Sequence, residues 1–212
     1  MKNYVTEFIG TFFLVLTIGL TVLSGTQFAP LAIGCSLMIM VYMGGHVSGG
    51  HYNPAVTLAV LMRGRVPAKD AVPYMLAQVA GAFVAAAAVR FLMGSSFPVE
   101  PPTTSTSMQV LLVEFLFTFA LALVVLNCAT AKATSGNSFY GLAIGFTVVV
   151  GAFAGGGISG GAYNPAVGVG PNLFHAISAR GSLAHIWLYL VGPFAGGAVA
   201  AIVFKLQNPG DA

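Results

Sequence analysis

Apolar residues in this chain gather into long segments that short polar or glycine-rich stretches separate. Six segments are long enough to cross a hydrocarbon core of roughly 30 Å, which takes about 20 helical residues. Backbone polar groups cannot stay unpaired in lipid, so only helices or a closed barrel can span it. Because the runs lack the period-two alternation of barrel strands, they predict helices. The predicted spans are Tyr4–Leu23, Thr26–Gly45, Ala71–Phe91, Met108–Cys128, Ser138–Gly157 and Ala184–Phe204.

The first span could be mistaken for a cleaved secretory leader. It carries Glu7 in the string EFIGTFFLVL, and Glu114 recurs in the related string EFLFTFALAL at the start of the fourth span. A removable leader has no reason to share a structural repeat with the rest of the chain. We therefore expect the first span to remain as a helix.

A glycine-rich frame interrupts the apolar pattern twice. It reads GGHVSGGHYNPAV from Gly44 to Val56 and GGGISGGAYNPAV from Gly155 to Val167. A match of this length indicates an internal duplication. Each frame follows the second span of a set of three, which predicts a first repeat at 1–94 and a second at 108–206 within one transmembrane domain, 1–212. Because three is odd, the two repeats enter the membrane from opposite sides and form an inverted repeat.

The residues after each Asn-Pro-Ala, Pro54–Met62 and Pro165–Ile177, are too few to span a bilayer and too apolar for an ordinary loop. Asn53 and Asn164 suit the N-cap, and the prolines suit the first helical position, where a missing N–H costs nothing. The preceding glycines permit non-helical backbone, which is tolerated at membrane depth only where it is buried in protein or lines a cavity. The predicted fold class is an all-α membrane protein with six transmembrane helices and two re-entrant half-helices.

Composition supports this class, because 57% of the 212 residues are hydrophobic and only 6% are charged.

Cytoplasmic loops are enriched in Lys and Arg, so the distribution of these residues predicts that both termini are cytoplasmic. The formal net charge of +3 comes from scattered residues and predicts no nucleic-acid partner. The short ends favour the plasma membrane of a bacterium or archaeon. This topology places Lys2, Arg63, Arg65, Lys69, Lys132 and Lys205 inside, and Arg90 and Arg180 outside.

Half-helices that enter from opposite faces would bring the two asparagines to one point near the middle of the membrane. Each would present an amide donor there, and the positive ends of the helix dipoles disfavour cations. A water molecule held by two donors through its oxygen does not readily pass on a proton. The pattern therefore predicts a narrow passage for neutral molecules, with Asn53, Pro54, Ala55, Asn164, Pro165 and Ala166 at its centre.

With these motifs the chain resembles the major intrinsic protein family, the aquaporins and aquaglyceroporins, over essentially its whole length. The resemblance implies a homotetramer in the lipid bilayer, with one pore in each subunit. It also implies that Glu7 and Glu114 are buried and brace the re-entrant loops, with Gln78 packed near them. His46 would line the cytoplasmic vestibule; a hydrogen-bonded loop histidine is the alternative.

Alignment to the motifs of this family places four residues at an outer constriction: Ile33, Ala152, Gly161 and Val167. Water-selective members usually have an aromatic residue, a histidine and an arginine among these positions, and this chain has none of them. Val167 stands where the arginine is expected, and it resembles plant tonoplast intrinsic proteins, some of which also have valine there. Loss of a fixed charge, of hydrogen-bond donors and of bulk predicts a wider and more apolar constriction.

The predicted function is a passive channel for water and small uncharged solutes that excludes protons and ions. Glycerol, urea, ammonia and hydrogen peroxide are all candidate solutes. Leu190 is similar to the residue that glycerol facilitators have at this position, where strict water channels tend to have tryptophan. In contrast, the segment after Val167 lacks the aspartate that is typical of glycerol channels. These two positions therefore disagree on the solute class.

Three other classes were weighed against a channel. A secondary transporter also uses inverted repeats and broken helices, but coupling normally needs an ionisable residue near the midplane, and Glu7 and Glu114 lie near helix starts. A structural membrane protein with a closed pore is a further alternative. An enzyme, a metal site and a cofactor are not expected, because the four histidines are scattered and Cys35 and Cys128 lie within apolar spans as small hydrophobic residues.

Overall fold

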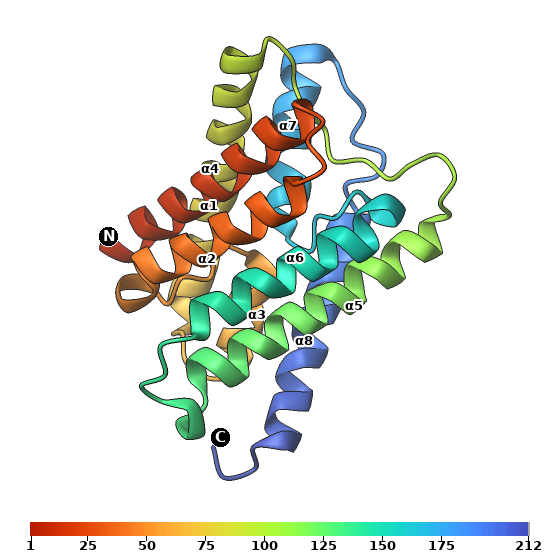
Figure 1. Ribbon diagram of the computed structural model, residues 1–212. Coiled ribbons are helices and arrows are strands. Elements are labelled where there is room, and N and C mark those ends of the chain that lie inside the picture. Colours follow the sequence, from red (N-terminus) through yellow and green to blue (C-terminus); the bar gives the residue numbers. More distant parts are fainter. Residues whose placement is uncertain (212) are drawn as a thin grey trace.

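The computed structural model describes residues 1–211, which form eight α-helices and two short helical turns (Figure 1). Six helices are long and apolar enough to cross a membrane. The two shorter helices, α3 (Pro54–Met62) and α7 (Pro165–Ala179), pack among the long ones. The predicted fold class is therefore confirmed. The long helices are α1 (Lys2–Leu23), α2 (Ala29–Ser48), α4 (Ala68–Met93), α5 (Ser107–Val125), α6 (Tyr140–Ser159) and α8 (Leu188–Gln207).

Helix ends differ from the predicted ones where turns compete with the apolar pattern. α3 has the predicted bounds, and α7 extends two residues beyond Ile177. α2 begins at Ala29 and not at Thr26, because Gly25 adopts a positive φ of 67° and a turn follows it. α8 begins at Leu188 and not at Ala184, because the preceding residues form turns with hydrogen bonds between residues three apart.

The fourth predicted span does not end as one regular helix. α5 stops at Val125, and the chain continues as a π-helical turn, Leu126–Thr130, before a 3₁₀ turn. The side chains of Asn127 and Thr130 hydrogen-bond to backbone carbonyls four residues earlier. Such side-chain bonds compete with the regular helical ladder, which accounts for the local change of winding.

The two halves of the chain have equivalent packing. α1 packs on α2 and α4 in the first half, and α5 packs on α6 and α8 in the second. α2 and α6 meet at Gly34 and Gly145, where a side chain on either glycine would collide with the carbonyl oxygen of the other at 2.5 Å. Small residues at this crossing let the two backbones approach closely, as is typical of membrane helices.

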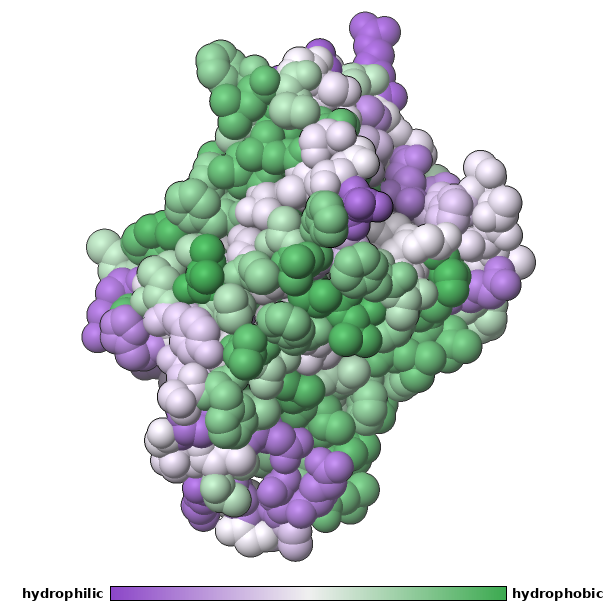
Figure 2. Space-filling view, in the orientation of Figure 1, coloured by the Kyte–Doolittle hydropathy of each residue, from purple (hydrophilic) through white to green (hydrophobic). Residues whose placement is uncertain are grey.

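The middle of the outer surface is apolar, and several strongly polar side chains of the long helices are buried. Figure 2 shows hydrophobic residues across the middle of one face and hydrophilic residues toward its ends. Large apolar side chains of α4, such as Leu76 and Phe91, are exposed, whereas Glu7, Gln78 and Glu114 are fully buried. This distribution suits a protein whose surroundings are lipid, because apolar side chains face the lipid and buried polar side chains can bond within the protein.

Candidate pore and the residues that support it

The first re-entrant loop, which joins α2 to α3, is held by Glu7 of α1. The Oε1 atom of Glu7 accepts hydrogen bonds from the Ser48 hydroxyl at 2.7 Å and from the backbone N–H of His51 at 3.0 Å. Its Oε2 atom accepts from the backbone N–H of Tyr52 and from the Gln78 side chain, both at 2.7 Å. The carboxylate thus satisfies backbone donors of a loop that has no regular secondary structure, which is what burial of such a loop requires.

Glu114 of α5 holds the second re-entrant loop in the same way. It accepts from the Ser159 hydroxyl at 2.7 Å and from the backbone N–H groups of Ala162 at 3.0 Å and Tyr163 at 2.6 Å. The sequence match of the two repeats aligns Pro193 with Gln78, and proline has no side-chain donor. Glu114 therefore accepts three hydrogen bonds within residues 1–211, one fewer than Glu7.

Tyrosine precedes the asparagine in each loop and has a strained backbone. Tyr52 and Tyr163 both have φ of 49°, in the left-handed region that bulky residues rarely adopt. Their hydroxyls donate to the backbone carbonyls of Met40 and Gly151, each at 2.9 Å. These long-range bonds and the carboxylate contacts together hold the backbone in a conformation that costs energy.

The two asparagines cap their half-helices and also tie the two loops together. The Asn53 Oδ1 atom accepts from the backbone N–H of Ala55 at 2.9 Å, and the Asn164 Oδ1 atom accepts from that of Ala166 at 2.9 Å. The Asn53 Nδ2 atom donates to the carbonyl of Tyr163 at 2.9 Å, and the Asn164 Nδ2 atom donates to that of Tyr52 at 2.8 Å. Each amide keeps one N–H beyond these contacts.

A cavity of about 230 Å³, here called the lumen, is lined by both asparagines and reaches from His51 to Val22 and Pro30, beside the loop that joins α1 to α2. All four residues that the sequence places at an outer constriction line it: Ile33, Ala152, Gly161 and Val167. Most of the remaining wall is aliphatic and comes from α1, α2, α5 and α6. The prolines and alanines of both Asn-Pro-Ala motifs do not line the lumen but are buried behind it.

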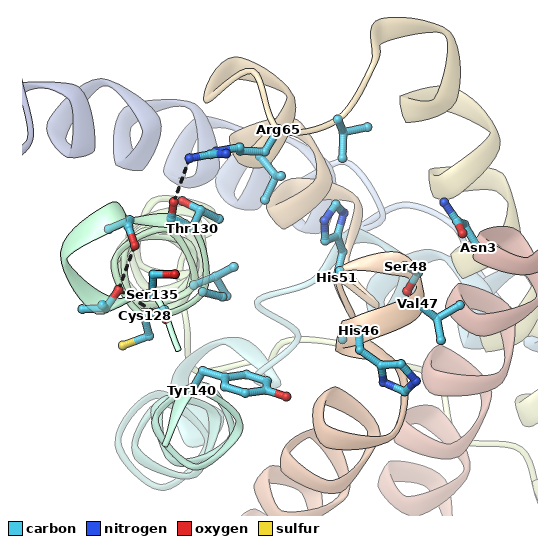
Figure 3. A pocket seen from close by; sticks show the side chains of 18 of the residues that line it. Asn3, His46, Val47, Ser48, His51, Arg65, Cys128, Thr130, Ser135 and Tyr140 are labelled. Carbon is cyan, nitrogen blue, oxygen red and sulfur yellow. Dashed lines mark hydrogen bonds between the residues drawn. The ribbon is translucent and has the colours of Figure 1, made fainter. Parts of the chain in front are cut away.

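A larger cavity of about 960 Å³ lies on the side of the termini and is called the vestibule. His46 and Tyr140 project into it from α2 and α6 (Figure 3). Arg65 and Cys128 lie on its wall. Cys35 and Cys128 are both free thiols, and both are half-buried. The His46 side chain is exposed and lines this cavity.

His51 lies where the vestibule and the lumen meet, since it lines both cavities. Its Nδ1 atom is 3.1 Å from the Thr57 hydroxyl, which also accepts from Gln78 at 2.9 Å. The prediction from sequence missed this residue. The sequence does mark this position, because the strings GGHYNPAV and GGAYNPAV differ only there, with His51 in the first repeat and Ala162 in the second.

Near the vestibule, the C-terminal segment closes onto α3. Asp211 forms an ion pair with Arg63 at 2.8 Å and accepts from the backbone N–H of Lys132 at 2.7 Å. This backbone hydrogen bond, with the charges of Arg63 and Lys132, lowers the pKa of Asp211 below its usual value. The Arg63 guanidinium is buried and stacks over the Phe204 ring at 4.8 Å. Among residues 1–211, no cluster of three metal-ligating side chains occurs.

These features define a class of protein: a multi-pass membrane protein in which two capped half-helices meet between two cavities. Residues 1–204 match the sequence profile described as Major intrinsic protein, and the chain belongs to that family. It is accordingly a channel for water and small solutes and not an enzyme.

Similar proteins span nearly the whole chain. Glycerol uptake facilitator protein-like 6 of Lactiplantibacillus plantarum is 36% identical over 224 residues that cover 100% of both chains. Aquaporin NIP1-1 of Zea mays is 36% identical and covers 97% of this chain and 74% of the plant protein. The X-ray structure of the aquaglyceroporin from Plasmodium falciparum superposes with a TM-score of 0.85 over 98% of this chain and 97% of that chain. Its sequence identity of 22% supports the shared fold alone.

Proposed function

We propose that water and small uncharged solutes pass from the vestibule, past His51, to the two asparagines and then through the lumen. The observation that carries this path is the position of Asn53 and Asn164, which cap opposed half-helices and line the lumen where it approaches the vestibule. The unused N–H of each amide is available to the oxygen of a passing molecule.

Exclusion of protons and ions is proposed for the same place. Both half-helices present their positive ends at the asparagines, and the wall around them is largely apolar, so a cation would lose its hydration without compensation. The buried carboxylates nearby are committed to the loops, because Glu7 and Glu114 each accept several hydrogen bonds there. That commitment favours a channel over a proton-coupled transporter.

The outer constriction is proposed to be wide and apolar. Ile33, Ala152, Gly161 and Val167 all line the lumen, and none of their side chains carries a charge or a donor. Such a ring admits solutes larger than water, and glycerol, urea, ammonia and hydrogen peroxide remain the candidates. One relative is named as a glycerol uptake facilitator-like protein and another as an aquaporin, and each is 36% identical to this chain.

The arrangement in the membrane is proposed from charge and from family resemblance. The side of the termini, where Arg63, Arg65 and Lys132 gather around Asp211, is assigned to the cytoplasm of a plasma membrane. The repeats are assigned to 1–94 and 108–206 of one domain, and the assembly in the lipid bilayer to a homotetramer with a pore in each subunit.

Stopped-flow light scattering on proteoliposomes tests this function, with water, glycerol and urea compared in one preparation. The proposal expects all three fluxes to exceed those of empty liposomes, with no proton flux. A protein that conducts none of them, or that accumulates a solute when a proton gradient is imposed, contradicts it.

A further inference from the structure

The connection between α4 and α5, residues 94–106, has no helix or strand, yet part of it is firmly buried. Phe97 and Val99 are 4% and 7% exposed. The Phe97 ring fits beside Gly19 of α1, where any side chain on the glycine would collide with it. Figure 1 shows this connection passing α7 on its way to α5. Its position must be set by particular contacts, because irregular backbone supplies few of its own.

One side chain of α7 holds this connection by both of its polar atoms. The Asn172 Oδ1 atom accepts from the backbone N–H of Val99 at 2.7 Å, and its Nδ2 atom donates to the carbonyl of Val99 at 2.9 Å. Asn172 is 3% exposed, so water does not compete for these bonds. The pairing also fixes the amide orientation, since only the oxygen can accept from an N–H.

The residue after Val99 touches the second re-entrant loop. A side chain placed on Gly160 would meet the carbonyl oxygen of Glu100 at 2.8 Å, so the two backbones are in direct contact there. Gly160 and Gly161 both line the lumen, and both have positive φ, of 87° and 71°. Residues 99–100 therefore back the part of the lumen wall that contributes Gly161 to the proposed constriction.

We propose that Asn172 is a positioning residue that sets the width of the outer constriction by holding residues 99–100 behind Gly160 and Gly161. Val167 lines the lumen from the same helix, about 1.4 turns before Asn172, but its aliphatic side chain cannot form such a bond. Glycines with positive φ have no side chain to fix them, so the backbone behind them decides how far the loop can move. The inference rests on the proposed constriction.

Loss of both bonds is expected to widen the constriction. In an Asn172→Leu variant the N–H and C=O of Val99 lose their partners, and the segment behind Gly160 shifts or becomes mobile. Glycerol and urea flux should then rise by several-fold relative to water flux. The matched control is Asn208→Leu, which removes an asparagine bonded to Asn127 and Phe204 on the side of the termini and lies outside both cavities.

An Asn172→Asp variant separates positioning from general stability. A protonated carboxyl offers one acceptor and one donor in the geometry of the amide, whereas a carboxylate only accepts and repels the Val99 carbonyl. The ratio of glycerol to water flux should be near that of the wild type at acidic pH and higher at neutral pH. The wild type and Asn208→Leu should show no such pH dependence.

The measurement is the ratio of glycerol to water permeability of these proteins in proteoliposomes, with the thermal unfolding midpoint taken in parallel. An unchanged permeability ratio in Asn172→Leu overturns the inference, whether or not the unfolding midpoint falls. A ratio in Asn172→Asp that does not change with pH also overturns it. A Val167→Arg variant measured beside them tests the constriction separately. If Val167→Arg does not lower glycerol flux relative to water flux, the proposed constriction is in the wrong place. If Val167→Arg lowers that ratio but Asn172→Leu does not raise it, the constriction stands and only the role of Asn172 is wrong.

Discussion

The Asn53 Nδ2 atom lies 2.9 Å from the backbone carbonyl oxygen of Tyr163, the residue before Asn164. The same contact occurs in the opposite sense, from Asn164 to Tyr52. Each asparagine is thus oriented by the other loop, and its remaining N–H has a fixed direction at the lumen. Orientation before a solute arrives lowers the cost of binding it briefly.

Replacing both asparagines, as Asn53→Asp with Asn164→Asp, should weaken cation exclusion. Carboxylates cannot donate to the tyrosine carbonyls, and they place negative charge where the helix ends are positive. We expect sodium or proton flux to rise about tenfold or more, the change that accompanies about 1.4 kcal/mol of barrier. Ion flux into proteoliposomes carrying a potential-sensitive dye measures this.

The control for that pair is Asn208→Asp, a change at an asparagine outside both cavities. It should leave ion exclusion at the level of the wild type. Intact exclusion in a correctly inserted double variant would count against the central role of the two amides.

The two loop-bracing carboxylates should respond differently to amide substitution. In Glu7→Gln, the Gln78 side chain can turn its Oε1 atom, which has no hydrogen-bond partner within residues 1–211, toward the new amide. In each variant the tyrosine N–H that faced the carboxylate then faces an amide N–H, but Pro193 offers no acceptor to the new amide in Glu114→Gln, which therefore has one more unmet group. The additional unpaired group in Glu114→Gln should lower the local stability of the second loop by about 1–3 kcal/mol.

Hydrogen exchange at the backbone N–H groups of Tyr52 and Tyr163 measures this difference. Exchange at Tyr163 should accelerate more in Glu114→Gln than exchange at Tyr52 does in Glu7→Gln, and each variant should leave the other loop unaffected. Equal acceleration in both loops would contradict the asymmetry of the two braces.

The sequence predicted the local elements of the site well because their causes are local. Asn-Pro at a helix start sets both the cap and the first turn, so the bounds of α3 were predicted as observed. Duplication of the frame predicted two such helices, and the family pattern supplied Ile33, Ala152, Gly161 and Val167, which the structure brings to one cavity.

Contacts between distant residues were not predictable in the same way. Nothing near Asn172 in the sequence indicates that it pairs with Val99, since the two are 73 residues apart. The π-helical turn after Val125 also escaped prediction, because the hydropathy pattern does not show that the Asn127 and Thr130 side chains bond to the backbone. Both glycine-rich frames have a tyrosine before the asparagine, but a repeated aromatic residue alone does not indicate a positive φ.

The ion pair of Asp211 should hold at neutral pH and open only in strong acid. Its pKa is lowered in the folded state, so its contribution to stability is present above the ordinary aspartate range, about 3.9, and is lost as pH falls through the lowered value. Asp211→Asn should loosen the contact at every pH. Hydrogen exchange at the Lys132 N–H between pH 7 and pH 3 follows the opening.

Loosening of this contact should also expose α3 to protease. Arg63 is 6% exposed in the closed state, so tryptic cleavage after it should be slow in the wild type and faster in Asp211→Asn. Lys205→Gln, a change at an exposed residue on the same side, is the control. Equal cleavage rates in all three proteins would show that Asp211 does not protect this helix end.

The most direct test of the central claim is the ratio of glycerol to water permeability in the wild type and in Val167→Arg. Val167 is 2% exposed and lines the lumen, and Gly161 leaves room within the same ring, so the guanidinium should project into the passage and not into lipid. The wide, apolar constriction proposed here predicts that glycerol and urea lose flux by a much larger factor than water does. Equal proportional losses of water and glycerol, at matched protein density, would contradict it and place the size limit elsewhere in the channel.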